Sequence, residues 1–124
     1  MLRREENKLI YEYDGEQVFI EPWGDHSVRV RATREPDMPK DNWALCEVPS
    51  EECDICILDK KAILTNGKIR VEISRLGKLT IYNQKNELIL EEYVRNRRDL
   101  LDEKCSAMEI GAREFKPIIG GIII

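Results

Sequence analysis

The feature that most constrains this chain is an alternation of apolar and polar residues, interrupted by turn pairs that contain glycine. Over residues 8–33, Asp14-Gly15 separates "KLIYEY" from "EQVFIEPW", and Gly24-Asp25 then leads into "HSVRVRAT". Successive side chains on a strand point to opposite faces, so a period of two is typical of a sheet with one buried face. Glycine tolerates the positive φ that tight hairpin turns require. This part of the sequence predicts a meander of three antiparallel strands.

The same alternation returns in residues 61–93 with three more turn signals. Asn66-Gly67, the pair favoured in type I′ hairpin turns, lies within "KAILTNGKIRVEIS". Leu76-Gly77 precedes "KLTIYN", and "NQKN" precedes "ELILEEY". These signals predict a second meander, of four strands.

The strand "HSVRVRAT" has two distinct faces and is followed by a less regular connection. The alternation places Val28 and Val30 in the core and Arg29 and Arg31 on the outside. Three prolines in residues 34–50 then make a central strand improbable there, because proline cannot donate to a sheet ladder. We interpret this stretch as a long connection in which Trp43 fills the core.

The C-terminal quarter has a weaker pattern. Residues 94–106 predict a short helix or a long loop, and residues 107–116 predict a strand with a bulge at Gly111. The apolar run at 118–124 predicts a strand paired inside a sheet, or else the edge of a truncated sandwich. The expected fold class is all-β, an antiparallel β-sandwich, or an incomplete half of one, built from meanders. Strands are predicted at 8–13, 16–23, 26–33, 53–58, 61–65, 68–74, 78–83, 87–93 and 107–116.

Length and charge limit the possible classes of protein. A chain of 124 residues is long enough for one domain, which we place at 1–124. The net charge of −4 gives no basic face for a nucleic acid, and no run approaches the roughly 18 apolar residues of a membrane helix. Without a recognisable secretory signal, the four cysteines are most simply reduced thiols, which predicts a cytoplasmic protein.

Residues that could catalyse a reaction are sparse. His26 is the only histidine, and no serine, cysteine or carboxylate stands at a spacing that would mark a triad. Carboxylates occur in the adjacent pairs Glu51/Glu52, Glu91/Glu92 and Asp102/Glu103. Neighbouring residues of a strand face opposite ways, so Glu91 and Glu92 should not converge on one substrate. No catalytic residue is predicted.

A metal or redox role for the cysteines is the next possibility. Cys53 and Cys56 have the spacing of a redox pair or half a zinc site, and Cys46 and Cys105 could complete a set of four thiolates. A second Cys-x-x-Cys is missing, and the acidic, strand-like surroundings should raise a thiol pKa. We therefore expect the cysteines to be incidental buried thiols, and we expect no metal and no cofactor.

Trp23 is the one candidate binding residue. It stands at a predicted hairpin turn, where an exposed indole could stack on the C–H face of a sugar. The alternative is that Trp23 fills a structural position.

Three stretches together resemble a known family. They are "HSVRVRATREPDMPKDNWALCE", "AILTNGKIRVEISRLGKLTIYNQKNELILEE" and "MEIGAREFKPIIGG". In this order they resemble the N-terminal region of glycoside hydrolase family 31, α-xylosidase-like and α-glucosidase-like members above all, over roughly residues 8–121. The stretches are structural, so the specificity of the resemblance comes from their number and order.

The resemblance implies a galactose-mutarotase-like N-terminal β-sandwich. In that family the catalytic aspartates lie on a following (β/α)₈ barrel, and no matching motif occurs in this sequence. The chain is then expected to be a non-catalytic domain that scaffolds the barrel of a retaining α-glucosidase or α-xylosidase, its partner, with carbohydrate bound only in the full-length context. A free-standing carbohydrate-binding module is the alternative. Open sheet edges further predict a homo-oligomer, with pairing through 118–124.

Overall fold

The computed structural model describes residues 1–13, 15–39, 53–92 and 115–117, and within these ranges every regular element is a β-strand. The described part of the chain includes no helix capable of crossing a membrane. The strands are β1 (Leu2–Glu5), β2 (Lys8–Tyr13), β3 (Glu16–Pro22), β4 (Val28–Thr33), β5 (Asp54–Ile57), β6 (Lys61–Asn66), β7 (Ile69–Ser74), β8 (Leu79–Asn83), β9 (Leu88–Glu92) and β10 (Phe115–Pro117).

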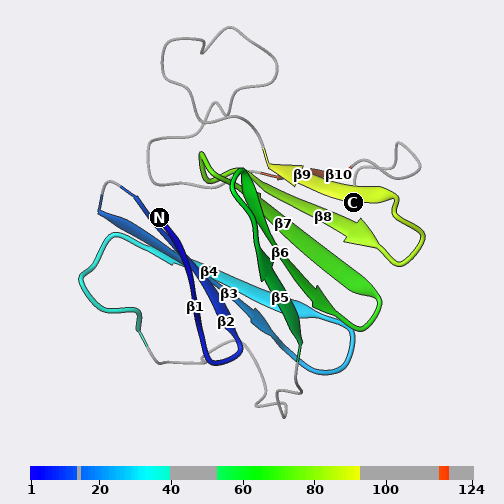
Figure 1. Ribbon diagram of the computed structural model, residues 1–124, viewed down its shortest axis with the longest axis horizontal. Helices are drawn as coiled ribbons and strands as arrows, with labels where there is room; N and C mark the ends of the chain where they lie inside the picture. The colour runs from blue at the N-terminus through cyan, green and yellow to red at the C-terminus, as the bar shows by residue number, and fades with distance from the viewer. Residues whose placement is uncertain (14, 40–52, 93–114, 118–124) are drawn as a thin grey trace, which may run out of the picture.

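These strands form two antiparallel sheets (Figure 1). The first has the order β1-β2-β3-β4, and the second has the order β10-β9-β8-β7-β6-β5. Within each sheet, strands that are neighbours in sequence are neighbours in space, as expected when turns join antiparallel strands. β4 and β5, which are consecutive in the chain, belong to different sheets. The prediction of an all-β antiparallel sandwich built from meanders is confirmed for the described residues.

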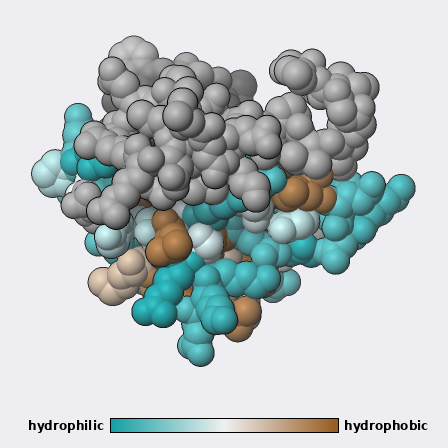
Figure 2. Space-filling view, turned by 90° about the horizontal axis from the view of Figure 1, so that it is seen from above, coloured by the Kyte–Doolittle hydropathy of each residue, from teal (hydrophilic) through white to brown (hydrophobic). Residues whose placement is uncertain are grey.

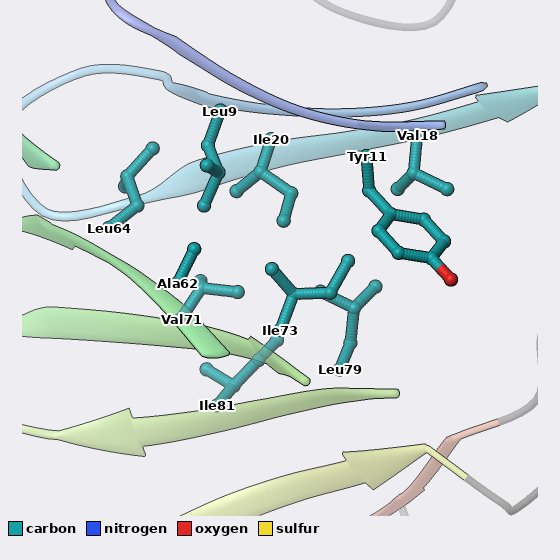
Figure 3. Close-up of a cluster of buried hydrophobic side chains, with 10 residues drawn as sticks. All are labelled: Leu9, Tyr11, Val18, Ile20, Ala62, Leu64, Val71, Ile73, Leu79 and Ile81. Atoms are coloured by element: carbon teal, nitrogen blue, oxygen red, sulfur yellow. The ribbon is translucent and has the colours of Figure 1, made fainter. Parts of the chain in front are cut away.

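The core lies between the two sheets (Figure 3). Alternate residues of each sheet point inward, so that side chains of β2 and β3 meet those of β6, β7 and β8. Most of them have no exposed surface. The buried cluster consists of Leu9, Tyr11, Val18, Ile20, Ala62, Leu64, Val71, Ile73, Leu79 and Ile81.

From β2 to β9, the observed strands coincide with the predicted ranges to within two residues at either end. For the predicted strand at 107–116, only Phe115 onward is described, and it belongs to β10. Trp43, the 94–106 segment, the bulge at Gly111 and the 118–124 strand lie outside the described residues. The sequence pattern did not reveal the register shift between Ile81 and Tyr82, where β8 pairs with β9.

The first strand is absent from the sequence prediction. β1 reads "LRRE", a charged segment with a single apolar residue, which fits an edge strand that buries little. Leu2 packs against the core, and the turn into β2 passes through Glu6 at a φ of 54°. A positive φ at a glutamate is uncommon, so the sequence contained no ordinary turn signal here.

The Asn66-Gly67 turn is a hairpin, but the prediction of a type I′ turn centred on these two residues is wrong. Asn66 pairs with Ile69 and remains in the strand, so the central residues are Gly67 and Lys68. Gly67 has a φ of 60°, whereas Lys68 is absent from the positive-φ residues of the described chain. A positive φ at only the first central residue is the pattern of a type II′ turn.

The surface of the described residues is mainly polar. Among the residues that Figure 2 colours by hydropathy, most of the visible surface is hydrophilic, and hydrophobic side chains form separate spots. Among the described residues, the large apolar side chains that are most exposed lie at strand ends and turns. They are Met1, Tyr13, Ile57, Leu58 and Leu76.

Candidate functional site

Trp23, the predicted sugar contact, begins the turn between β3 and β4. Its backbone N–H donates to the carbonyl of Ser27 at 2.9 Å, and the Ser27 hydroxyl donates to the carbonyl of Trp23. The indole is half-buried, and the Arg29 guanidinium lies 4.1 Å from the ring centroid. This cation–π contact occupies one face of the indole, so a sugar could stack only on the other. A carbohydrate contact at Trp23 therefore stays a prediction.

Beside Trp23, the outer face of the first sheet carries a charged cluster that is largely removed from water. The Glu21 carboxylate Oε1 lies 2.8 Å from Arg29 Nε and 2.8 Å from Arg31 Nη2, and Glu21 is only 6% exposed. Arg31 Nη1 also donates to the carbonyl of Pro39 at 2.7 Å. Both arginines lie on the predicted outer face, but they neutralise a buried carboxylate instead of extending into solvent.

His26 contributes to the contact between the two sheets. Its exposed ring lies against the turn between β6 and β7, where Nδ1 accepts a hydrogen bond from the Lys68 backbone N–H at 3.1 Å. A Cβ added at Gly67 would lie 2.1 Å from this nitrogen, so the two turns are in tight contact. The lone pair of His26 Nδ1 therefore accepts a hydrogen bond from the backbone of the neighbouring turn.

Asn66 is the residue whose role the sequence reasoning missed. It is 3% exposed, and its Nδ2 donates to the carbonyl of Gly24 at 2.9 Å and to that of Ser27 at 2.7 Å. One side chain of the second sheet thus satisfies two backbone acceptors of the first sheet. The sequence showed only the Asn-Gly pair. That pair predicts a turn, but it does not indicate which groups the Asn66 side-chain amide contacts.

The two described cysteines do not form a site. Cys53 is half-buried and packs against the core, whereas Cys56 is exposed on the other face of β5, opposite Ile63. Burial is the main cause that raises the pKa of the Cys53 thiol, which disfavours a reactive thiolate. The described residues include no group of three or more metal-ligating side chains, and Cys46 and Cys105 lie outside them.

The carboxylates of Glu91 and Glu92 diverge, as the strand geometry predicted. Glu91 Oε1 lies 2.6 Å from Lys78 Nζ on the outer face of the second sheet. Glu92 is 1% exposed, and its Oε1 accepts the backbone N–H of Leu79 at 3.0 Å. The acidic pairs considered at 51–52 and 102–103 lie outside the described residues.

A surface hollow of about 380 Å³ is lined in part by both cysteines, where the turn after β1 approaches β5 and β6. Its other polar lining residues are Arg4, Asn7, Asp54 and Thr65. The lining contains no histidine that could activate a thiol, and it contains one carboxylate, whereas glycoside hydrolysis requires two. In the described part of the chain the arrangement supports packing and sheet-to-sheet contact.

Comparison with known proteins was made by sequence and by structure. No protein-family model matches the chain. An uncharacterized family 31 glucosidase of Pseudescherichia vulneris is 34% identical over 123 residues, a match that spans 93% of this chain and 23% of that protein. The crystal structure of a family 31 α-xylosidase from a soil metagenome, in complex with xylose, superposes with a TM-score of 0.76 at 37% identity. This superposition covers 99% of this chain and 19% of the α-xylosidase.

Both relatives are named as family 31 enzymes, the family that the three sequence stretches resemble. In each of them the matched segment makes up less than a quarter of the relative's length. The agreement extends over nearly the whole of this chain, in sequence and in fold. The chain is therefore homologous to one β-sandwich segment of the enzymes of glycoside hydrolase family 31.

Proposed function

We propose that this chain is a non-catalytic N-terminal β-sandwich, of the galactose-mutarotase-like kind, from a retaining α-glycosidase of family 31. Its role is to scaffold the catalytic barrel of the full-length enzyme. The substrate class of that enzyme is an α-glucoside or an α-xyloside, in line with the names of the two relatives.

One observation carries the proposal: the chain aligns with its relatives over almost all of its own length, but with only 19% to 23% of theirs. Most of such an enzyme therefore lies outside the matched segment. The acidic side chains that glycoside hydrolysis requires would come from that remainder, since Glu21 and Glu91 are ion-paired and Glu92 is buried on the opposite face from Glu91.

Exposed apolar side chains at one end of the sandwich support a docked partner. Leu76, in the turn between β7 and β8, is 92% exposed, and Leu58, after β5, is 49% exposed. The two turns are neighbours, because the Arg75 N–H donates to the Lys60 carbonyl at 2.8 Å. Burial of such side chains is favourable, so we assign this end to contact with the barrel.

The test is an activity comparison between the 124-residue chain and the full-length enzyme encoded by its gene. The full-length enzyme should hydrolyse nitrophenyl α-glucoside or nitrophenyl α-xyloside, and the 124-residue chain should release no more nitrophenol than a mock preparation. Turnover by the chain alone would refute a non-catalytic role. A gene that encodes no barrel would refute the proposed parent.

Three further expectations belong to the same proposal. Calorimetric titration of the isolated chain with glucosyl and xylosyl oligosaccharides should give no binding, whereas clear binding would favour a free-standing carbohydrate-binding module with Trp23 in contact with the sugar.

Light scattering should detect a homo-oligomer of the isolated chain, and a monomer at high concentration would contradict this. Fractionation of the source cells should place the parent enzyme in the cytoplasm.

A further inference from the structure

The segment that follows β4, residues 34–39, turns back beside the first sheet. Figure 1 shows it leaving the end of β4 on the side of the first sheet that faces away from the second sheet. The reversal begins where the Glu35 backbone N–H donates to the Thr33 hydroxyl at 3.1 Å. Apart from the half-buried Met38, the residues of this segment are exposed, so its position depends mainly on polar contacts.

Two side chains on the outer face of the first sheet hold the segment at successive positions. Gln17 Nε2 donates to the Pro36 carbonyl at 2.8 Å. Arg31 Nη1 donates to the Pro39 carbonyl at 2.7 Å. Gln17 pairs with Thr33, the last residue of β4, whereas Arg31 lies two residues earlier on that strand. The segment therefore runs back along β4 in the opposite direction, over the outer face of the sheet.

The contact at Pro39 depends on the Glu21 carboxylate. Arg31 Nε lies 3.0 Å and Arg31 Nη2 lies 2.8 Å from the same oxygen, Glu21 Oε1. A guanidinium group is planar and rigid, so holding two of its nitrogens fixes the direction of the third. The third nitrogen, Nη1, is the one that donates to the Pro39 carbonyl. The ion pair thus orients the donor that holds the segment.

Burial makes the contact through Arg31 stronger than the contact through Gln17. Glu21 is 6% exposed, and the side chain of Arg31 is 20% exposed. Arg29 Nε lies 2.8 Å from Glu21 Oε1 as well, so the carboxylate is anchored by a second cation. Charge-assisted hydrogen bonds are roughly twice as strong as neutral ones, and the Gln17 amide makes a neutral bond at an exposed position.

We propose that Glu21 and Arg31 form a positioning device that fastens residues 34–39 to the outer face of the first sheet. Arg31 contacts the segment, Glu21 acts through Arg31, and Gln17 is a second, weaker fastening. The chain passes through this segment on its way from β4 in the first sheet to β5 in the second, so the device determines the direction in which the connection leaves the first sheet. The device does not depend on the proposed function.

Limited digestion of the 124-residue chain with trypsin tests this role, because the bond after Arg34 can enter a protease only when the segment leaves the sheet. Arg31→Lys keeps the charge but loses the rigid fork, so cleavage after Arg34 should become at least about tenfold faster. Cleavage after Lys85, in the exposed turn between β8 and β9, is the internal reference and should keep its rate. Arg75→Lys, at an exposed arginine in the turn between β7 and β8, is the matched control and should change neither rate.

Two further variants separate the contributions of the fastenings. Gln17→Ala removes only the contact at Pro36, so cleavage after Arg34 should become about threefold faster. Glu21→Gln should accelerate this cleavage as much as Arg31→Lys does. The double variant should be no faster than the faster single variant, because Glu21 acts through Arg31.

The outcomes that would overturn the proposal are distinct. An unchanged rate after Arg34 in Arg31→Lys would show that Arg31 does not hold the segment. Equal acceleration after Arg34 and Lys85 would show a general loss of stability in place of a local release. Effects of Glu21→Gln and Arg31→Lys that multiply in the double variant would show that Glu21 does not act through Arg31. If Glu21→Gln does not fold, Arg31→Lys and Gln17→Ala still decide whether the segment is fastened.

Discussion

Two asparagines occupy the same position in two hairpins of the second sheet, yet their side chains serve different parts of the molecule. Asn66 is the last residue of β6 and Asn83 is the last residue of β8. The Asn83 Oδ1 accepts the backbone N–H groups of Lys85 at 2.9 Å and Glu87 at 3.0 Å, both in its own turn. The Asn66 amide instead donates to two carbonyls of the other sheet.

The difference follows from what lies opposite each turn. The turn after Asn83 is exposed from Gln84 to Glu87, so water can replace any hydrogen bond that is lost there. The turn after Asn66 faces the turn between β3 and β4. If the buried Asn66 amide is removed, the Gly24 carbonyl loses this donor and the Ser27 carbonyl keeps only the Trp23 N–H. Substitutions in the two turns should therefore differ in cost, which can be measured by urea denaturation.

The largest effect is expected at Gly67. In Gly67→Ala the new Cβ would lie 2.1 Å from His26 Nδ1 and 2.2 Å from the Asp25 carbonyl oxygen, at a φ of 60°. We expect a loss of roughly 3 kcal/mol in the free energy of unfolding, because backbone strain and a clash add together. Gly15→Ala is the matched control, since its φ is 80° and no atom lies within 4 Å of the added Cβ. Equal losses in the two variants would show that the contact between the turns contributes nothing.

The next effect is expected at Asn66. Asn66→Ala should cost about 2 kcal/mol, because it leaves the Gly24 and Ser27 carbonyls without this donor while the site remains buried. Asn66→Asp should be at least as destabilising, since a carboxylate would face two carbonyl oxygens. A cost below that of Asn83→Ala would contradict the tertiary role of the Asn66 amide.

The smallest effects are expected in the exposed turn. Asn83→Ala should cost about 0.5–1 kcal/mol, because the two backbone donors that it leaves can bond to water. Asn86→Gly, at a φ of 68°, should change stability by no more than about 0.5 kcal/mol, since glycine adopts this conformation readily. A loss above about 2 kcal/mol for Asn83→Ala would indicate that this turn, too, has a tertiary partner.

The strands and most turns could be predicted because their signals are local. Alternation sets the inner face of each strand, and Gly15, Gly24 and Gly77 all adopt the positive φ expected of glycine in a turn. β1 was missed because an edge strand needs few apolar residues, and its turn places Glu6, not glycine, at positive φ. The cluster at Glu21 was missed because a carboxylate on an outer face normally indicates exposure, and its burial depends on two arginines of the next strand.

The sequence by itself determined the all-β class, the hairpins and the family resemblance, because each of these depends on residues that are close together in the chain or on their order. Only the tertiary structure decided which side chains connect the two sheets. Asn66 illustrates the reason. Its turn depends on its immediate neighbours, whereas its hydrogen bonds depend on residues 39 and 42 positions away, which only the packing of the two sheets brings within reach.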